Sequence, residues 1–554
     1  MNKLFYCFII FLALLISGCQ SSSEIEEAAQ SITEEKLLSH IEVISSDEFE
    51  GRATASEGEE KTVNYLVNEL ESLGVSPGMD NGSYVQEFPL LGQTVEPSSA
   101  SYTLKQNGQV LNDLEFRADF VAWPANEAEQ IDVNDAELLY VGYGIQAPEF
   151  DWDDYKDADV EGKVLVFKNS DPSYDENIFG GEGRLYYGRW SYKFEKAADM
   201  GALGAIIIHT TPTAGYGWNV VSNSWSGEQF YLKSEEGEAE TMPDFNSWLT
   251  EPVSTELFEA AGLNLNEMLE AADDPEFQPV TLDGITVDVD LEANYSNMSS
   301  RNVLGEIKGN DPDLMDQYLI FTAHYDHLGI TNPVEGDSIN NGALDNAAGV
   351  SSLLNLAEAY KMVQPEMQRS ALFLFVGAEE MGLLGAKYWA ANPTVHPGNV
   401  TANFNLDGMQ VYGQTEDVVL VGYGRNTITD VFEDYAQMGD RTIAPDPYPE
   451  QGYFYRSDHF ALAQIGIPAV FPNPGQEYIN KPDDWSETVD SLDTANYHSV
   501  NDEINEFWDL SGMEQDVRLF FRTSFDILNR NEMMEWYSGD EFEAVREEML
   551  EEAP

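Results

Sequence analysis

Apolar residues follow a helical spacing near the start of the chain. Helical periodicity begins near Thr33, which is a suitable N-cap. From Glu57 to Leu73 the apolar side chains again fall on one face of a helix, and Gly74 is placed to end it. This part of the chain is therefore predicted to be helical.

After Tyr295 the pattern changes to apolar runs that end in polar clusters. Helical patterns over Asn346–Tyr360 and Gly382–Ala391 separate the runs, which are YLIFTAHYD, RSALFLFVGAEE and NVTANFNLDG. Apolar strands that alternate with helices are typical of a mostly parallel sheet covered on both faces. We predict an α/β fold with a mostly parallel mixed sheet flanked by helices, whose site lies outside the carboxyl ends of the strands.

The middle of the chain, from about Phe116 to Gln278, has short β-like pieces and many aromatic residues. A helical pattern covers Tyr192–Met200. The one histidine of this segment, His209, follows an apolar run and is interpreted as the end of a strand. We predict an inserted α/β domain with few catalytic groups.

The first residues have the pattern of an export signal. Lys3 precedes an apolar run that is too short for a comfortable membrane span, and small residues lead to Cys19. The sequence Ile-Ser-Gly-Cys resembles a bacterial lipobox, in which Cys19 carries the lipid; an ordinary signal peptide cut nearby is the alternative. We expect an exported protein that is lipid-anchored to the outer membrane, on the periplasmic or cell-surface side.

Charge and cysteine content exclude several classes of protein. The chain has 27 Lys and Arg against 100 Asp and Glu, so nucleic acid and anionic membrane surfaces are poor partners. The membrane would be reached only through lipid on Cys19. Cys7, the only other cysteine, lies in the predicted signal, so we expect no disulfide, no cysteine nucleophile and no cysteine-ligated zinc.

Five polar clusters carry the residue types that bind divalent metal ions. Imidazole and carboxylate groups suit Zn²⁺ and similar ions, and a pair of ions needs several carboxylates, usually with one bridge. Each cluster alone also fits a helix cap or a solvated loop. Buried strands that repeatedly end in acidic residues indicate a cation that compensates them. The clusters are His324–His327, Leu344–Asn346, Glu379–Glu380, Asn405–Asp407 and Tyr497–His498.

The motifs around these clusters resemble peptidase family M28, a family of zinc aminopeptidases. In order along the chain they are SSDEFEGRATASEGEE, AHYDHLG, NGALDNAAGV, FVGAEEMGLLGAKYW, FNLDGM, RSDHFALAQIGIPAVF and YHSVNDE. The middle segment, with VGYGI and YKFEKAADMGALGAIIIH, resembles the protease-associated (PA) domain that many members carry. The resemblance implies a zinc-exopeptidase (phosphorylase/hydrolase-like) fold with an inserted PA-type α/β domain.

The resemblance also implies a site with two Zn²⁺ ions, about 3.5 Å apart. His324 would bind one ion, and Asp345 would bridge the two. Glu380 and His498 would complete the ligands of one ion, and Asp407 those of the other.

Three further residues would serve the chemistry. Asp326 would orient the imidazole of His324. Glu379, beside the ligand Glu380, would act as general base and then as acid. Tyr497 would stabilise the tetrahedral intermediate; the alternative is an aromatic side chain that packs beside a ligand.

Two histidines near these motifs are not assigned to the metal ions. His327 is expected to pack in its loop, and His459 to lie at the start of a helix capped by Ser457. The family pattern further implies a cis peptide bond between Asp345 and Asn346.

The leading hypothesis is a zinc aminopeptidase that hydrolyses N-terminal peptide bonds with water activated by a dinuclear zinc centre and a Glu general base. Its partners would be peptides with a free N-terminus; the oligomeric state stays open. One alternative is a carboxypeptidase of the glutamate carboxypeptidase type, which needs cations that this Arg-poor chain hardly offers. Another is a glutaminyl cyclase-like acyltransferase, which uses one zinc. A receptor-like relative without activity is disfavoured because every ligand is present.

The composition shifts and motifs predict six segments. They are a lipoprotein signal peptide at 1–18, a tether at 19–30, an N-terminal part of the peptidase domain at 31–115, the inserted PA domain at 116–290, the catalytic zinc peptidase domain at 291–535 and an acidic tail at 536–554.

Overall fold

The structure is a computed structural model that describes residues 23–156, 158–175, 178–181, 183–234, 239–334 and 336–553. The predicted signal peptide and Cys19 lie outside the described residues. Within the described ranges, no helix is both long enough and apolar enough to cross a membrane. The chain forms two compact units. The first holds the described chain up to Phe88, Ser299–Pro447 and the chain from Arg456 onwards; the second holds Pro89–Met298 and Tyr448–Tyr455.

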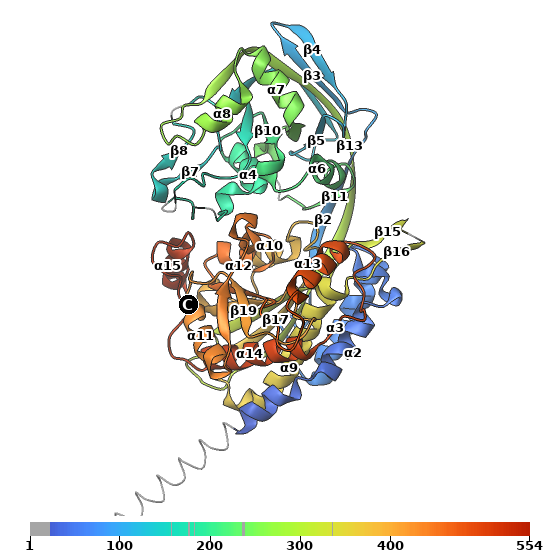
Figure 1. The fold of residues 1–554 in the computed structure, drawn as a ribbon, viewed down its shortest axis with the longest axis vertical. Coiled ribbons are helices and arrows are strands. Elements are labelled where there is room, and N and C mark those ends of the chain that lie inside the picture. The colour runs from blue at the N-terminus through green and yellow to red at the C-terminus, as the bar shows by residue number, and fades with distance from the viewer. Residues whose placement is uncertain are drawn as a thin grey trace, which may run out of the picture. The chain divides into compact units, whose positions relative to one another are not determined.

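The first unit is built on a mixed sheet whose four central strands are parallel. In spatial order its main strands are β13 (Val280–Ile307), β17 (Ser370–Val376), β14 (Tyr318–His324), β18 (Val400–Asn405), β21 (Ala469–Asn473), β19 (Asp417–Val421) and β20 (Thr442–Pro445). The strands from β17 to β21 run parallel, whereas β13 and β19 are antiparallel to their neighbours in this group. The predicted mostly parallel sheet flanked by helices is confirmed (Figure 1).

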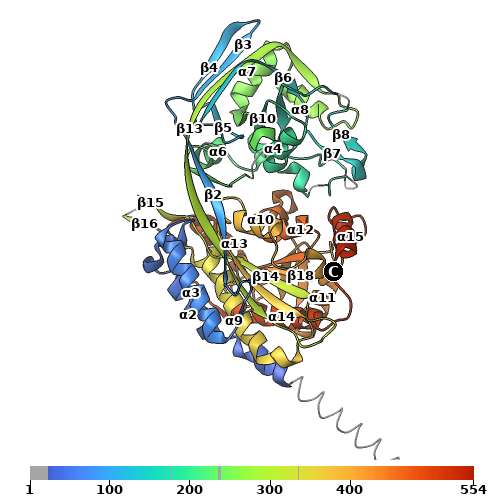
Figure 2. The same cartoon turned by 180° about the vertical axis from the view of Figure 1, so that it is seen from behind.

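Both faces of this sheet are buried, as solidly apolar strands require. Alternate residues of β14 serve different cores: Leu319 and Phe321 belong to one cluster, Tyr318 and Ile320 to the other. Figure 2 shows the helices of the first cluster alongside the sheet. They are α2 (Glu34–Ile44), α3 (Glu57–Leu73), α9 (Ala348–Val363), α11 (Ile428–Met438) and α14 (Ser511–Leu528); the second cluster receives α10 (Leu384–Ala391) and α12 (His459–Gln464).

The helix boundaries near the N-terminus follow the predicted capping. The Thr33 side chain accepts a hydrogen bond from the backbone N–H of Lys36 at the start of α2. Helix α3 ends at Gly74, which has a φ of 69°, a left-handed conformation that glycine adopts at low cost.

The rest of the first unit carries shorter elements. They are β1 (Ser76–Pro77), the start of β2 (Val85–Val95), the hairpin β15 (Gly329–Val334) with β16 (Asp337–Asn340), α13 (Trp485–Asn496) and α15 (Glu543–Glu552). Helix α15 lies in the predicted acidic tail and is packed, since the buried Arg546 donates to the backbone carbonyl oxygens of Pro397 and Met534, each at 3.3 Å.

The second unit is also α/β. Strands β6 (Gln130–Tyr140), β9 (Val164–Lys168), β10 (Gly204–His209) and β12 (Phe245–Thr250) run parallel, and β5 (Phe120–Pro124) joins β12 in the antiparallel sense. His209 is the last residue of β10, as the sequence predicts. The remaining elements are β3 (Ser101–Gln106), β4 (Gln109–Leu114), β7 (Gln146–Ala147), β8 (Trp152–Asp153), β11 (Gln229–Leu232), α4 (Trp190–Asp199), α5 (Thr211–Ala214), α6 (Trp218–Ser224), α7 (Glu251–Ala260) and α8 (Leu265–Ala271).

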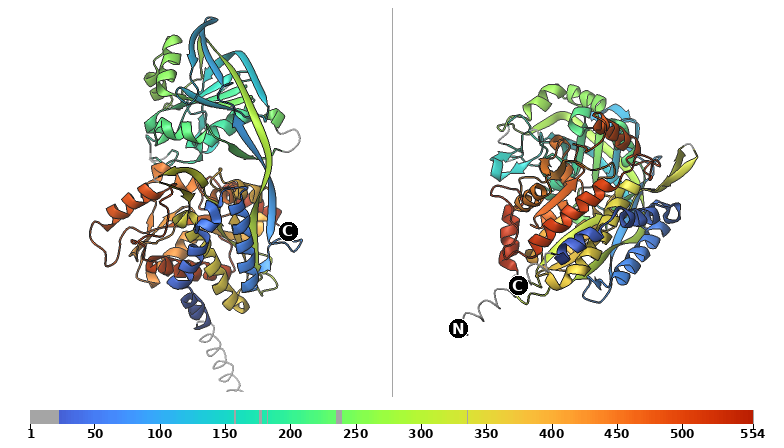
Figure 3. Two further views of the ribbon diagram at one scale, coloured as in Figure 1. Left: turned by 90° about the vertical axis from the view of Figure 1, so that its right-hand side faces the viewer. Right: turned by 60° about the horizontal axis from the view of Figure 1, so that its bottom comes forward.

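The second unit begins earlier and ends later than the predicted 116–290. Its described part starts at Pro89 because β3 and β4 pair with each other and β3 pairs with the 285–290 part of β13. Strand β13 is one continuous strand that includes the second boundary, at Met298 (Figure 3). A continuous strand offers no loop or composition change in the sequence at which to place that boundary.

The predicted solvated tether at 19–30 is wrong for its described part. Residues 23–31 form a helix, and Ala28, Ala29 and Ile32 are fully buried in the first core. The Arg518 guanidinium donates to the backbone carbonyl oxygens of Ala29 and Ile32. Small apolar side chains among glutamates look solvated in sequence, yet they let this helix approach α14 closely.

Two adjacent substitutions test whether this helix is packed. Ala29→Leu places a larger side chain in a filled core and should lower the free energy of unfolding by about 1–3 kcal/mol. Gln30→Leu introduces the same residue at the neighbouring exposed position and should change stability by less than about 0.5 kcal/mol. Urea unfolding followed by tryptophan fluorescence measures both. Equal midpoints for the two variants would show that the segment is only a tether.

Candidate metal centre

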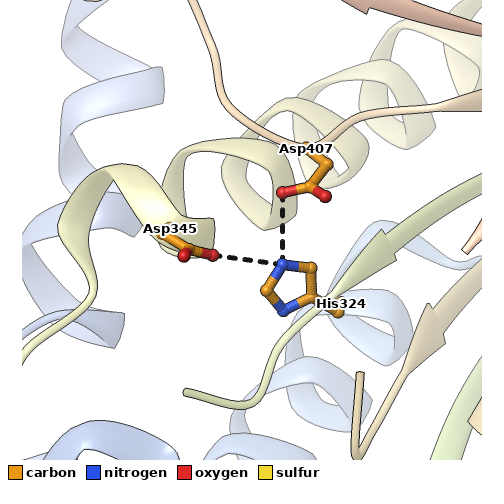
Figure 4. A group of neighbouring side chains, drawn as sticks. All are labelled: His324, Asp345 and Asp407. Carbon is orange, nitrogen blue, oxygen red and sulfur yellow. Dashed lines mark hydrogen bonds and ion pairs between the residues drawn. The ribbon is translucent and has the colours of Figure 1, made fainter. Parts of the chain in front are cut away.

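Three neighbouring parallel strands bring the predicted ligands to one edge of the sheet. His324 is the last residue of β14, the Glu379–Glu380 pair follows β17, and Asp407 follows β18. Since β17, β14 and β18 are parallel and adjacent, their carboxyl ends lie together. Asp345 comes from the start of the segment that leads into α9, and Figure 4 shows it beside His324 and Asp407.

The five predicted ligands form two sets that share Asp345. His324 Nε2 lies 3.2 Å from Asp345 Oδ1 and 3.2 Å from Asp407 Oδ1. His498 Nε2 lies 3.2 Å from Asp345 Oδ2 and 3.1 Å from Glu380 Oε2. Asp345 thus presents one carboxylate oxygen to each set.

These spacings fit metal ligation. Zinc binds imidazole nitrogen and carboxylate oxygen at about 2.0–2.2 Å with tetrahedral angles, so two ligand atoms on one ion lie about 3.3–3.4 Å apart. The observed 3.1 and 3.2 Å separations within each set are close to this value. The residues present therefore have the donor atoms and the spacing to hold divalent metal ions.

The charge of the site also calls for cations. Asp345, Glu379, Glu380, Asp407 and Asp458 converge here, and no Lys or Arg nitrogen of the described chain lies within 4.0 Å of their carboxylates. Burial and the neighbouring carboxylates hold the pKa of Glu379 and of Asp458 well above the ordinary range. Anions buried together are costly unless a cation compensates them.

The predicted orienting role of Asp326 toward His324 stays a prediction, and its carboxylate makes further contacts. Its carboxylate lies 3.9 Å from His324 Nδ1, which instead is 3.2 Å from the backbone carbonyl oxygen of Asp326. The carboxylate accepts hydrogen bonds from the backbone N–H groups of Glu379, at 3.0 Å, and Glu380, at 3.3 Å. Asp326 therefore fixes the main chain of the glutamate pair.

A series of buried hydrogen-bonded side chains, which was not predicted from the sequence, holds Asp407. The Ser457 hydroxyl donates to Asp407 Oδ2 at 2.6 Å, and the Asn405 amide donates to the Ser457 hydroxyl at 2.7 Å. The Thr322 hydroxyl donates to Asn405 Oδ1 at 2.7 Å. The polar residues at alternate positions of apolar β14 and β18 were the signal that could have revealed it. Ser457 serves Asp407 here rather than capping α12.

The loop around Asp345 is held from two sides. Asp502 accepts hydrogen bonds from the backbone N–H groups of Leu344 and Asp345, both at 2.9 Å. The Asn346 amide donates to the backbone carbonyl oxygen of Leu406 at 2.9 Å. The peptide bond between Asp345 and Asn346 is cis, as the family resemblance implies.

Arg52, from the first matched motif, is fully buried below the site. Its guanidinium donates to the carbonyl oxygens of Tyr325, at 2.8 Å, Asn341, at 2.6 Å, and Gly342, at 2.8 Å. It thereby joins the loop after His324 to the loop before Asp345. Burial lowers the pKa of Arg52 to about 10, so it stays charged at neutral pH.

Tyr497, His459 and His327 lie in three different environments. Tyr497 is 65% exposed and stacks on His498, with ring centroids 3.9 Å apart. Its catalytic role stays a prediction. His459 is the first residue of α12, as predicted, and is buried next to Phe471. His327 does not merely pack in its loop, because its Nδ1 lies 2.6 Å from Glu380 Oε1.

Ser457 provides a test of the hydrogen-bonded side chains that hold Asp407. Ser457→Ala removes the hydroxyl that orients Asp407 and should weaken binding of one zinc ion by about 10- to 100-fold, the usual effect of losing an outer hydrogen bond. Ser457→Thr keeps a hydroxyl and should retain most of the affinity. Competition with a chromophoric chelator measures both variants. Unchanged zinc affinity in the alanine variant would contradict the assigned role.

Residues 302–518, which contain the five predicted ligands, match the family model described as peptidase family M28, as the motifs in the sequence imply.

Curated relatives align with part of the chain. It is 28% identical over 232 residues to probable leucine aminopeptidase 2 of Aspergillus oryzae, covering 39% of this chain and 43% of that protein. It is 24% identical over 236 residues to a probable lipoprotein aminopeptidase of Mycobacterium tuberculosis, again covering 39% and 43%. The chain thus spans less than half the length of these relatives.

Among solved structures, the chain is similar to the aminopeptidase from Aneurinibacillus sp. strain AM-1. The TM-score is 0.51 at 20% sequence identity, over 91% of this chain and 95% of that chain. At this level of identity the similarity supports the fold.

Proposed function

We propose that this protein is a two-zinc aminopeptidase that removes residues from peptides with a free N-terminus. The observation that carries the proposal is the pair of ligand sets that share Asp345 at the carboxyl ends of parallel strands. His324 and Asp407 would complete the ligands of one ion, and Glu380 and His498 those of the other. The match to the model of peptidase family M28 and the names of the curated relatives agree with peptide substrates.

The protein side chains divide the chemistry between them. When bound, the two ions would supply Lewis acidity that lowers the pKa of water and polarises the scissile carbonyl. Glu379 accepts a proton from the attacking water and passes it to the leaving amine nitrogen. Its carboxylate is suited to this task because it makes no hydrogen bond within the described chain, while Asp326 holds its backbone N–H. The acidic site also attracts the ammonium group of a free N-terminus.

The location is part of the proposal. An exported, lipid-anchored protein follows from the apolar N-terminal run that leads to Cys19. A relative in Mycobacterium tuberculosis is named a probable lipoprotein aminopeptidase, which agrees with this location. Lipid on Cys19 would be the only membrane contact.

Substitution of each glutamate in turn tests whether Glu380 is a metal ligand and Glu379 the group that transfers the proton. Glu379→Gln keeps the size of the side chain but cannot accept a proton, so kcat should fall by at least about 10²- to 10⁴-fold while two zinc ions stay bound. Glu380→Gln removes a charged ligand and should lower zinc content. Metal analysis and kcat of each purified variant, beside the wild type with two ions per chain, measure the difference. Zinc loss in Glu379→Gln, or near-normal turnover, would overturn the assignment of the base.

Substrate blocking separates the three enzyme classes. An aminopeptidase should cleave a free aminoacyl peptide and lose turnover when the N-terminus is acetylated. A carboxypeptidase of the glutamate carboxypeptidase type should accept the acetylated peptide, and a glutaminyl cyclase-like enzyme should release ammonia from an N-terminal glutamine. Chromatography of the products with each of the three substrates distinguishes them. Equal rates on blocked and free peptides would reject the aminopeptidase.

A further inference from the structure

His327 is a second buried imidazole beside the bridging aspartate. It lies in the loop that follows β14 and is 1% exposed. Its Nδ1 is 2.6 Å from Glu380 Oε1 and 4.0 Å from Asp345 Oδ2. By residue type and position, His327 therefore competes with His498 for the role of imidazole ligand in the set that contains Glu380.

The distances separate the two histidines. His498 Nε2 lies 3.1 Å from Glu380 Oε2, near the separation of about 3.3–3.4 Å expected for two ligands on one tetrahedral zinc ion. His327 Nδ1, at 2.6 Å from Glu380 Oε1, is too close for that arrangement. A charge-assisted hydrogen bond between N–H and a carboxylate is short, at about 2.7–2.9 Å, so a proton rather than an ion fits between these atoms.

The other ring nitrogen supports the same assignment. His327 Nε2 is buried and has no hydrogen-bond partner within the described chain. Nothing in the described chain therefore holds a proton on Nε2, and with the proton there the Nδ1 lone pair would face the Glu380 carboxylate oxygen at 2.6 Å, acceptor against acceptor. The tautomer with its proton on Nδ1 makes Nδ1 a donor to Glu380, not a ligand with a free lone pair.

The backbone around His327 is itself fixed. Its N–H donates to the carbonyl oxygen of Arg52 at 3.4 Å, and Arg52 in turn holds the carbonyl oxygen of Tyr325 at 2.8 Å. The His327 ring meets the His498 ring edge-on, with centroids 5.8 Å apart. The imidazole is therefore a rigid donor, not a mobile side chain that reaches Glu380 by chance.

We propose that His327 is a positioning residue of the metal centre: its Nδ1–H holds Glu380 Oε1, which turns Oε2 toward His498 and Asp345, the residues that would bind one ion together with Glu380. The inference rests on the proposed function and adds a selectivity to it. His327 contacts Glu380 and lies 4.0 Å from Oδ2 of Asp345, the oxygen that faces His498, and it has no hydrogen bond or ion pair with His324 or Asp407 in the described structure. It should therefore support the ion of the set with Glu380 and His498 more than the other. Its loss should make the two sites unequal.

Zinc titration of the metal-free full-length protein tests this inference without any turnover measurement. His327→Phe keeps a ring but has no donor, and it should weaken one of the two binding events by about 10- to 100-fold while the other stays unchanged. His327→Asn retains an N–H donor on a short side chain and should stay within about threefold of the wild type for both events, given the scale of outer hydrogen-bond effects.

Two control variants set the scale. His498→Phe removes a ligand and should abolish the binding event that His327→Phe only weakens. His209→Phe makes the same change at a buried histidine of the second unit, 4% exposed, and should leave both events unchanged. Circular dichroism of each variant checks that the fold is retained.

Several outcomes would overturn the inference. Complete loss of one ion in His327→Phe, as in His498→Phe, would make His327 a ligand, and wild-type binding of both ions would reduce it to packing. If His327→Phe does not fold, a crystal structure of the zinc-loaded wild type decides, because an Nδ1–zinc distance near 2.0 Å contradicts the proposal. A wild type that binds fewer than two ions would reject the proposed function itself, whereas the other outcomes reject only the role of His327.

Discussion

The parallel alignment of β17, β14 and β18 is the constraint on which the site depends. Because these strands run the same way and are in register, His324, the glutamate pair and Asp407 leave the sheet at one edge. Burial of both faces of the sheet keeps the strands in place, and the same burial makes the converging carboxylates expensive without a cation. The same backbone arrangement thus brings the candidate metal-binding side chains together and creates the need for a cation among them.

The convergence of the five candidate ligands could be predicted from the sequence because each follows an apolar run or lies in a motif of fixed order. The groups that hold them could not. The Asp326 carboxylate accepts hydrogen bonds from the main chain of Glu379 and Glu380, and His327 lies close to Glu380; neither contact could be predicted from the sequence. These contacts depend on distances of a few tenths of an ångström between segments far apart in the chain.

The sheet and helices were predictable for the same periodic reasons, whereas the limits of the units were not. Alanines and glutamates in residues 23–31 look solvated, but the core that buries Ala28 and Ala29 is made largely of residues distant in sequence. The boundary near Met298 falls inside a continuous strand. Neither the burial of the 23–31 helix nor the boundary near Met298 can be predicted from local composition, because both depend on pairing and packing with segments distant in sequence.

The second unit is not formed by one continuous segment, because Tyr448–Tyr455 also belong to it. Within that unit the Arg184 backbone N–H donates to the carbonyl oxygen of Pro449 at 3.1 Å, and the chain then reaches Ser457, which holds Asp407. Deletion of Pro89–Met298 would remove the residues against which Tyr448–Tyr455 pack, including Arg184. This segment would then lack its partners two residues before Ser457. Deletion of Pro89–Met298 alone would therefore leave part of the second unit behind. A minimal catalytic fragment also needs a replacement for Tyr448–Tyr455.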